Sequence, residues 1–417
     1  MSRSDTPRRR LSLGMIGPGL LLAATGVGAG DLATGSFVGG LLGTAVLWAV
    51  LVGAFFKFVV TEGLTRWQLA TGQTLIEGVA SRLGRGALLL FMPYLLLWSF
   101  FVGSALMSAA GVTLHAMLPV FEDAKSGKLV FGASASLVGL VLVWFGGYRL
   151  FDHLMRVCIV VMFVTVILTA IFLWPGTGAV LEGLFIPRIP DAGGQGLVWT
   201  LALIGGIGGT LTVLCYGYWL REEGLDERED LRACRIDLAM GYAMTAIFGV
   251  AMVIVGSSVS IEGSGAQLLV TLSGRLEEVM GLFGKWLFLT GTFGAVFSSL
   301  LGVWQCVPYL FADCWDLLRG RRDAAFKVDT SALPYRTYLF MIAIVPMLGL
   351  FWRFRDVQML YAVIGALLFP VLALALLIFN GRPSWVGSAF VNRPLTVAVL
   401  VIVLVFFSVL ALRPYFA

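Results

Sequence analysis

The chain has 417 residues, of which 59% are hydrophobic and only 13% are charged, and its formal net charge is +5. A soluble domain is usually about 45–50% apolar and about 25% charged, so this chain has too few polar residues to cover a soluble globule. The composition predicts a polytopic membrane protein in a lipid bilayer. It argues against a nucleic-acid binder, a disulfide-stapled secreted domain and a cytosolic enzyme.

The chain begins with a basic segment, residues 1–13, which contains four arginines. No small-residue cleavage site follows it, so we expect a cytosolic tail and not a signal peptide. Apolar runs then recur along the chain, each close to the roughly twenty residues that cross a bilayer. They predict about eleven transmembrane helices, at 14–38, 41–60, 88–112, 129–146, 154–175, 197–220, 237–257, 286–311, 337–352, 357–380 and 394–412.

The basic residues indicate the orientation of these helices. If the N-terminus is cytosolic, most of the 29 lysines and arginines fall in inner loops or at the inner ends of helices. Cytoplasmic loops are enriched in Lys and Arg. We therefore expect a multi-pass protein of the plasma (inner) membrane with its N-terminus in the cytoplasm and its C-terminus outside.

Two of the spans are unusually rich in glycine, the first around Gly26–Asp31 and the sixth around Ile204–Tyr218. They occupy corresponding places in two five-helix blocks, 14–175 and 197–380, with residues 394–412 as an additional helix. Paired helices interrupted by glycine are typical of inverted-repeat transporters, which bind substrate at the two breaks near the midplane. The alternative is that these glycines only allow close helix packing.

Several short motifs then occur in a characteristic order along nearly the whole chain. They are Gly17-Pro18-Gly19 with Ala33-Thr34, the stretch Arg66–Gln73, the stretch Gly147–Leu150, the approach Leu184–Pro190 and the stretch Gly291–Gln305. In this order the chain resembles the Nramp divalent-metal transporters. The resemblance implies an all-α LeuT-type fold, a five-plus-five inverted repeat with discontinuous helices 1 and 6.

The resemblance also implies where the substrate site lies and how it departs from the family pattern. The family's Asp-Pro-Gly-Asn motif aligns with Gly28-Ala29-Gly30-Asp31, and its Met-Pro-His motif aligns with Leu214-Cys215-Tyr216. The candidate substrate or metal residues are therefore Asp31, Gly28, Ala29, Leu214, Cys215, Tyr216 and Gly217. We expect the two helices to be unwound near Gly26–Asp31 and Thr212–Gly217, with Gly26, Gly28, Gly30 and Gly217 as the helix-break glycines. The helix 10 position that carries glutamine in many members aligns with Leu368.

Asp31 is the carboxylate that this alignment places at the breaks. An ionisable residue at membrane depth is a functional candidate, although Asp31 could instead cap the outer half of its own span. Cys215 is a candidate soft ligand for Zn²⁺ or Cd²⁺, against the simpler interpretation that it fills space. A hydrated Mg²⁺ needs only one or two carboxylates and fits the remaining set better.

Other charged residues have plainer interpretations. We expect Lys57, Glu62 and Arg66 to lie at the inner end of helix 2, with a local ion pair and with the lysine extending to the interface. Asp313 and Asp316 end helix 8 on the cytosolic side, where they are candidates for a gate pair with an arginine of an inner loop.

The leading interpretation is thus an Nramp-related secondary transporter, and not an enzyme, that moves a divalent cation such as Mg²⁺ or Mn²⁺ into the cell. The divalent metal is its substrate, and no cofactor is expected. Helix 3 lacks an acid between Leu88 and Val112, and Tyr216 replaces a histidine, so proton coupling is not expected. The alternative is a permease for a small organic solute such as an amino acid or amine. The sequence is compatible with a monomer.

Overall fold

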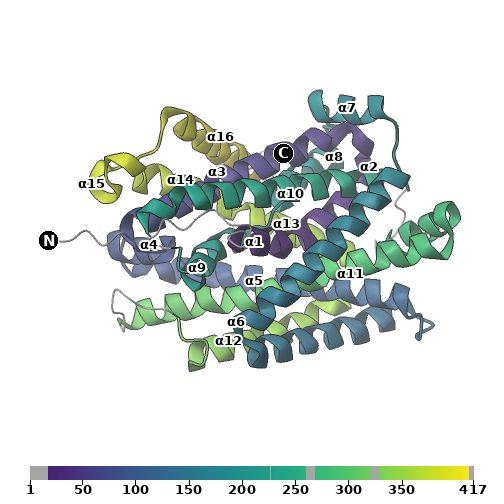
Figure 1. The fold of residues 1–417 in the computed structure, drawn as a ribbon, viewed down its shortest axis with the longest axis horizontal. Helices are drawn as coiled ribbons and strands as arrows, with labels where there is room; N and C mark the ends of the chain where they lie inside the picture. Colours follow the sequence, from purple (N-terminus) through teal and green to yellow (C-terminus); the bar gives the residue numbers. More distant parts are fainter. Residues whose placement is uncertain (1–16, 226, 260–267, 321–327, 413–417) are drawn as a thin grey trace, which may run out of the picture.

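The computed structural model describes residues 17–225, 227–259, 268–320 and 328–412, and every regular element in these ranges is a helix (Figure 1). The expected tail 1–13 lies outside them. The elements of the first half are α1 (Pro18–Gly26), η2 (Val27–Thr34), α2 (Gly35–Leu42), η3 (Gly43–Val46), α3 (Leu47–Thr71), α4 (Leu75–Arg82), α5 (Gly86–Met117), α6 (Ala124–Phe172) and α7 (Thr177–Phe185).

The second half begins with the sixth span. Its elements are α8 (Gln195–Gly206), η4 (Leu211–Cys215), α9 (Tyr216–Glu222), η5 (Arg228–Asp230), α10 (Leu231–Ser257), α11 (Leu268–Arg319), α12 (Leu333–Ile344), η6 (Val345–Phe351), α13 (Phe354–Ala366), α14 (Leu368–Phe379), α15 (Pro383–Val386), η7 (Ser388–Phe390) and α16 (Pro394–Leu412).

The all-α, polytopic fold expected from the sequence is confirmed. Eight helical stretches of the described residues are long and apolar enough to cross a membrane. The number is lower than eleven partly because neighbouring spans merge. The stretch α6 has 49 residues, about 74 Å at 1.5 Å per residue, whereas a bilayer core is about 30 Å thick. It holds two expected spans, which meet at Gly147, where φ is +63°.

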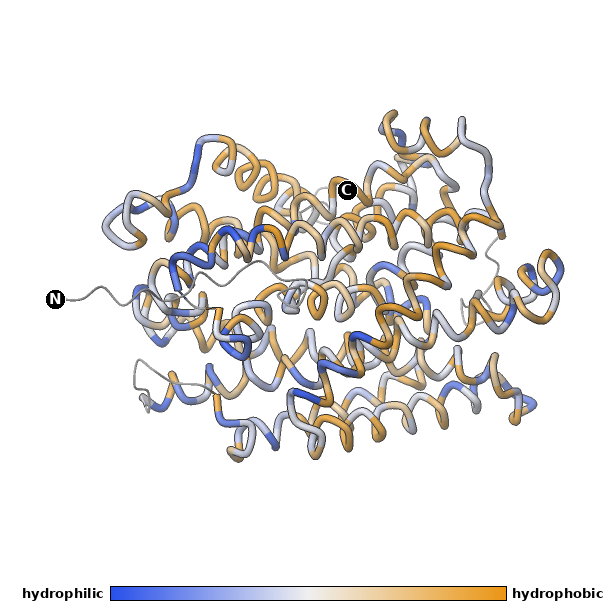
Figure 2. Tube along the Cα trace, in the orientation of Figure 1, coloured by the Kyte–Doolittle hydropathy of each residue, from blue (hydrophilic) through white to orange (hydrophobic). Residues whose placement is uncertain are grey.

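The surface of the bundle is apolar over most of its length. Figure 2 shows hydrophobic residues along the middle of most helices and hydrophilic residues mainly toward their ends. Large side chains such as Leu90 and Phe145 are about four-fifths exposed, at 81% and 80%. In a soluble protein such residues would mark contact surfaces, but a lipid-facing surface requires them.

The first span lies in the centre of this bundle. In Figure 1, α1 is surrounded by the longer helices, and it packs against α10, α11 and α6. The following π-helix η2 contacts α8, α10, α11 and α13. The sixth span packs against α3 and α13 through α8. The two glycine-rich spans therefore meet inside the protein, away from lipid.

Candidate functional site

The first glycine-rich span is interrupted by a stretch of π-helix and not by an unwound segment. In η2 the N–H groups bond to carbonyls five residues earlier, which widens the helix, and such turns are frequent at functional sites. The N–H of Gly28 donates to Ser299 Oγ of α11 over 2.7 Å. A Cβ on Gly28 would lie 2.6 Å from that oxygen, so this close approach requires glycine. The unwinding expected near Gly26–Asp31 is thus corrected to a widened, continuous helix.

The sixth span is broken, but earlier in the chain than expected. At Ile207 the backbone leaves the helix, with ψ at 131°. Gly208 and Gly209 follow with φ of +72° and +83°, a conformation that a Cβ makes costly. The chain resumes as a 3-10 helix at Leu211. We call residues 207–210 the break.

The expected break glycines are therefore placed differently from the prediction. Gly217 lies inside α9, so its assignment to a break was wrong. Its carbonyl accepts a hydrogen bond from Gln68 Nε2 of α3 over 2.8 Å, which makes it a packing contact. Gly26 ends α1, and Gly28 and Gly30 lie in η2.

Asp31 joins the two spans. Its side chain is fully buried, and Oδ1 accepts a hydrogen bond from the N–H of Gly208 over 2.9 Å. Its Oδ2 is also buried and has no hydrogen-bond partner among the described residues. The helix after η2 starts without a side-chain cap. Asp31 therefore binds the break of the other span, and the capping role considered for its own span is not what the geometry shows.

Lys57 of α3 reaches the same break from another direction. Its Nζ donates to the carbonyls of Gly205 over 2.9 Å and Ile207 over 2.6 Å, and to that of Gly209. It also lies 4.4 Å from the centroid of the Phe369 ring, a cation–π contact. Its side chain is completely buried. The expectation that Lys57 extends to the inner interface was wrong, because its length lets it reach α8.

The ion pair expected beside it is present. Arg66 Nε lies 2.8 Å from Glu62 Oε2, and Arg235 of α10 pairs with the other oxygen of Glu62 over 2.7 Å. Glu62 and Arg66 lie on the same helix as Lys57, about one and a half and two and a half turns farther on. Lys57, Glu62 and Arg66 are close in sequence, but Lys57 binds the backbone of the sixth span and takes no part in this ion-pair cluster.

Further polar side chains, which the sequence analysis missed, surround Asp31 and the break. Trp98 Nε1 donates to Thr210 Oγ1 over 2.7 Å, and Tyr361 hydrogen-bonds to the same threonine. Gln358 Nε2 donates to Thr34 Oγ1 over 3.0 Å. Helix 10 thus reaches η2 through Gln358, ten residues before the aligned position Leu368. A polar residue buried early in an apolar span was the signal that could have identified it.

Three of the candidate site residues have partners other than Asp31 in the part of the chain that the structure describes. They are Leu214, Cys215 and Tyr216. The hydroxyl of Tyr216 donates to Asp237 Oδ2 over 2.8 Å, and the same carboxylate oxygen accepts the N–H of Gly19 over 2.7 Å. Tyr216 therefore helps to hold the start of α1. Ala29 lies within η2.

Cys215 is buried, and its thiol contacts that of Cys306 in α11. In the part of the chain that the structure describes, no group of three or more His, Cys, Asp or Glu side chains lies close enough together to hold a metal. A soft, thiolate-rich metal site is thus not formed by these residues.

A second polar cluster lies where α9, α4 and α11 meet. Asp313 Oδ2 accepts a hydrogen bond from the hydroxyl of Tyr218. Arg221 pairs with Glu77 over 2.7 Å, and its charge also attracts Asp313. The candidate gate pair of Asp313 with an arginine therefore has an electrostatic basis, although the closest partner of Arg221 is Glu77.

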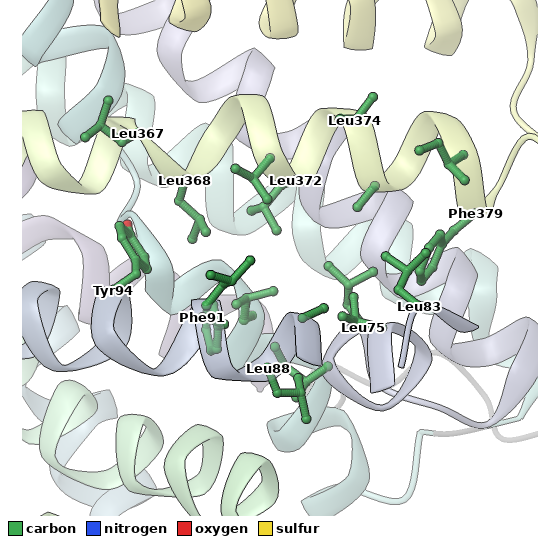
Figure 3. A pocket seen from close by; sticks show the side chains of 18 residues that line it. Leu75, Leu83, Leu88, Phe91, Tyr94, Leu367, Leu368, Leu372, Leu374 and Phe379 are labelled. Carbon is green, nitrogen blue, oxygen red and sulfur yellow. The ribbon is translucent and has the colours of Figure 1, made fainter. Parts of the chain in front are cut away.

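Leu214 and Leu368 line an apolar cavity of about 460 Å³ between α4, α5 and α14 (Figure 3). Figure 3 shows Leu368 and Leu372 of α14 facing Phe91 and Leu88 of α5 across this space. The lining is almost wholly hydrocarbon, so it offers no ligand to an ion. Leu368 is a packing residue here.

The site is thus built on one segment of backbone, residues 205–209, between two buried charges. The carboxylate of Asp31 takes an N–H of this segment, and the ammonium of Lys57 takes three of its carbonyls. The two charges are near enough to attract each other. Buried charges persist in proteins when they are paired and hydrogen-bonded. The remaining oxygen of Asp31 is a carboxylate oxygen, a chemical type that hard cations bind.

Comparison with known proteins identifies the family that the chain matches. The family model described as "Natural resistance-associated macrophage protein-like" (Nramp) matches residues 19–416. The chain is 26% identical over 327 residues to the divalent metal cation transporter MntH of Chromohalobacter salexigens, covering 72% of this chain and 71% of the relative. It is 22% identical over 296 residues to MntH of Aeromonas hydrophila, covering 67% of each.

Solved structures show the same fold. A mutant of the Eremococcus coleocola manganese transporter superposes with a TM-score of 0.75 at 16% identity, covering 95% of this chain and 86% of that one. MhsT in complex with L-phenylalanine superposes with a TM-score of 0.57 at 14% identity, covering 93% and 97%. At these identities the likeness concerns the fold.

Proposed function

The chain belongs to the Nramp family, and from this membership we propose that it is a secondary transporter that carries a divalent metal cation, Mg²⁺ or Mn²⁺, across the plasma membrane into the cell. The single observation that carries the proposal is the position of Asp31. This buried carboxylate lies where the two interrupted spans meet, and one of its oxygens accepts no hydrogen bond within the described residues. Membrane-embedded carboxylates of this kind mark ion pathways.

The chemistry of the site favours a hard cation. Asp31 supplies one anionic oxygen, and the hydroxyl groups nearby belong to threonine and tyrosine. Mg²⁺ binds oxygen ligands, keeps several of its waters and needs only one or two carboxylates. Because Lys57 already compensates the charge of Asp31, the divalent ion must compete with that ammonium. We therefore expect weaker binding than at a site with two carboxylates.

The alternative, a permease for an amino acid or amine, is less well supported. The curated relatives are named as divalent metal cation transporters. The amino-acid complex among the fold neighbours shares only 14% identity.

We further propose that the two blocks 14–175 and 197–380 form the inverted repeat, that the N-terminus is cytoplasmic, and that the protein works as a monomer. The support for the repeat is that each block begins with a span that departs from α-helical geometry at its middle, through the π-helix η2 in one and the break at residues 207–210 in the other. Reconstituted protein labelled at either end and probed from one side tests the orientation.

Uptake is proposed to proceed without proton symport. The support is that α5 carries no acidic residue and that Tyr216 is engaged by Asp237. In liposomes loaded with a pH-sensitive dye, metal uptake should leave the internal pH at the level of protein-free liposomes. Metal-driven acidification would contradict this part of the proposal.

The function itself is tested by uptake into proteoliposomes. Initial rates for Mg²⁺ and Mn²⁺ are measured against protein-free liposomes, with a panel of amino acids and amines supplied in parallel. Metal uptake above background, without competition from the organic solutes, is the expected result. Amino acid uptake without metal uptake would favour the alternative permease.

A further inference from the structure

We propose that the end of α8 and the break of the sixth span together form a cation cradle, from the carbonyls of Gly205, Ile207 and Gly209, and that the protein fills it with its own Lys57 ammonium. The cradle is a binding site for a small monovalent cation of the ammonium type, permanently occupied by a tethered one. Its existence is argued from geometry alone. Its consequence for transport rests on the function proposed above.

The three carbonyls converge because of the backbone around them. A helix that ends leaves its last four carbonyls without helical partners, and the end of α8 carries a partial negative charge. Gly208 and Gly209 then turn the chain through positive φ. This turn brings the carbonyl of Gly209 to the same Nζ that already binds Gly205 and Ile207.

The contacts define the form of the lysine that fits. Carbonyl oxygens can only accept hydrogen bonds, and only a protonated amine has three N–H donors and no acceptor. Three carbonyls at one Nζ therefore select the ammonium. The ring of Phe369, 4.4 Å away, faces the cation from another side, and the whole side chain is excluded from solvent.

The arrangement differs from an ordinary basic cap at a helix end. Such caps are usually near the surface and bind the last helical carbonyls. Here two of the three acceptors, Ile207 and Gly209, lie beyond the end of α8. In broken-helix transporters, unwound carbonyls of this kind can coordinate Na⁺. In this chain an ammonium from α3 takes that place.

A functional consequence follows for the transported ion. Because the cradle is filled, a dissolved monovalent cation is not needed to compensate its carbonyls. The divalent ion then contends for Asp31 and not for the backbone of the break. Uptake should therefore be independent of Na⁺ and K⁺, and Lys57 should be the residue that makes it so.

The test empties the cradle and refills it from solution. Lys57→Ala is purified in detergent, and its thermal unfolding is followed with ethylammonium or with tetramethylammonium chloride at equal concentration. We expect the midpoint to fall by several degrees relative to the wild type and to recover in part with ethylammonium. Tetramethylammonium has the same charge but no N–H donor, so it should not restore the midpoint.

Lys128→Ala is the matched control. Lys128 is also a buried lysine of a long helix, but within the described residues its Nζ donates to one backbone carbonyl, that of Trp352, over 2.6 Å. Without a cradle, this variant should gain nothing specific from ethylammonium. Equal recovery of both variants would mean that the cation acts on the protein in general, and it would overturn the proposal.

The wild type provides a second test, should Lys57→Ala fail to fold. Uptake of Mg²⁺ and Mn²⁺ is compared in Na⁺, K⁺ and N-methylglucamine buffers, and equal rates are expected. A rate that requires Na⁺ or K⁺ would overturn the inference. Absence of metal uptake in all three buffers would instead contradict the proposed function, and the unfolding data would then decide the cradle separately.

Discussion

Glycine has a different structural role in each of the two glycine-rich spans. In the first span, the glycines allow close approach: a Cβ on Gly28 would meet Ser299, and one on Gly26 would lie 2.7 Å from the backbone of Gly208. The helix itself continues through a π-helical stretch. In the sixth span, Gly208 and Gly209 turn the chain through positive φ, and the helix stops.

This difference determines what each span contributes near the two buried charges. The continuous first span can carry a side-chain ligand, Asp31, at a fixed place in η2. The interrupted sixth span offers backbone groups, an N–H to Asp31 and three carbonyls to Lys57. One span thus supplies charge, and the other supplies dipoles between the two charges. Variants of Asp31 should therefore change cation uptake, whereas variants of the break should change the thermal unfolding midpoint.

The largest expected effect is that of Asp31→Asn. Asparagine can still accept the hydrogen bond from Gly208, so the fold should persist, but the negative charge is lost. A divalent cation leaving water needs that charge, and we expect uptake of Mg²⁺ and Mn²⁺ to fall to about a tenth or less. Initial rates at matched reconstituted protein measure this. Wild-type uptake would remove Asp31 from the pathway.

The next effect compares two glycines of the sixth span. Gly209→Ala forces a Cβ into a left-handed conformation, at a cost of about 1–2 kcal/mol. Gly217→Ala lies in a helix, where the added Cβ meets only the end of the Gln68 side chain. We expect thermal unfolding to shift by a few degrees for the first.

The control for this pair is the double variant Gly217→Ala with Gln68→Ala, which removes the steric conflict and should restore the midpoint of Gly217→Ala. A Cβ at position 209 would also meet the side chain of Thr212. Substituting Thr212 should nevertheless not restore the midpoint of Gly209→Ala, because the cost of that variant lies in the backbone conformation. Full recovery of the midpoint in that double variant would contradict a backbone origin of the cost.

The effect of Tyr216→Phe on transport should be smaller than that of Asp31→Asn. This variant removes the hydrogen bond to Asp237 and leaves the Asp31 region unchanged. A hydrogen bond to a charged group contributes about 1.5–3 kcal/mol, so stability should fall. The ratio of Mg²⁺ to Mn²⁺ uptake should not change. A shift in that ratio would return Tyr216 to the substrate site.

The smallest effect is expected for Cys215→Ala. The thiol lies against Cys306 in a buried, apolar setting, and alanine keeps part of its volume. Uptake of Mg²⁺ and Mn²⁺ should stay within about twofold of wild type, since no charged ligand is lost. Abolished uptake would indicate a soft-metal site, and competition by Zn²⁺ or Cd²⁺ would then be the measurement to make.

The sequence predicts the spans well because about twenty apolar residues leave little choice in a bilayer. Glycine density also locates the two special spans. It cannot say which glycines take positive φ, and the break therefore lies five residues before the expected Thr212. Nor does alignment by position locate Gln358, because the chemistry depends on which residue of helix 10 reaches Thr34.

Lys57 shows the limit most clearly. Its neighbours in sequence, Glu62 and Arg66, form the expected ion pair, and the same local argument puts the lysine at the interface. Its actual partners are about 150 residues away, at separations of 148 to 152. A contact between helices this far apart in the chain has no local pattern. Only the cost of a lysine within an apolar span indicated a special role.

In the proposed function, Asp31 is the charge that binds the transported cation. Titration calorimetry of Mg²⁺ and Mn²⁺ into the purified wild type and into Asp31→Asn tests it most directly, with thermal unfolding as the check that both are folded. We expect saturable binding to the wild type and none to Asp31→Asn, which should still unfold cooperatively but at a lower midpoint, because Lys57 loses its opposite charge. Equal affinity in both proteins would contradict the claim.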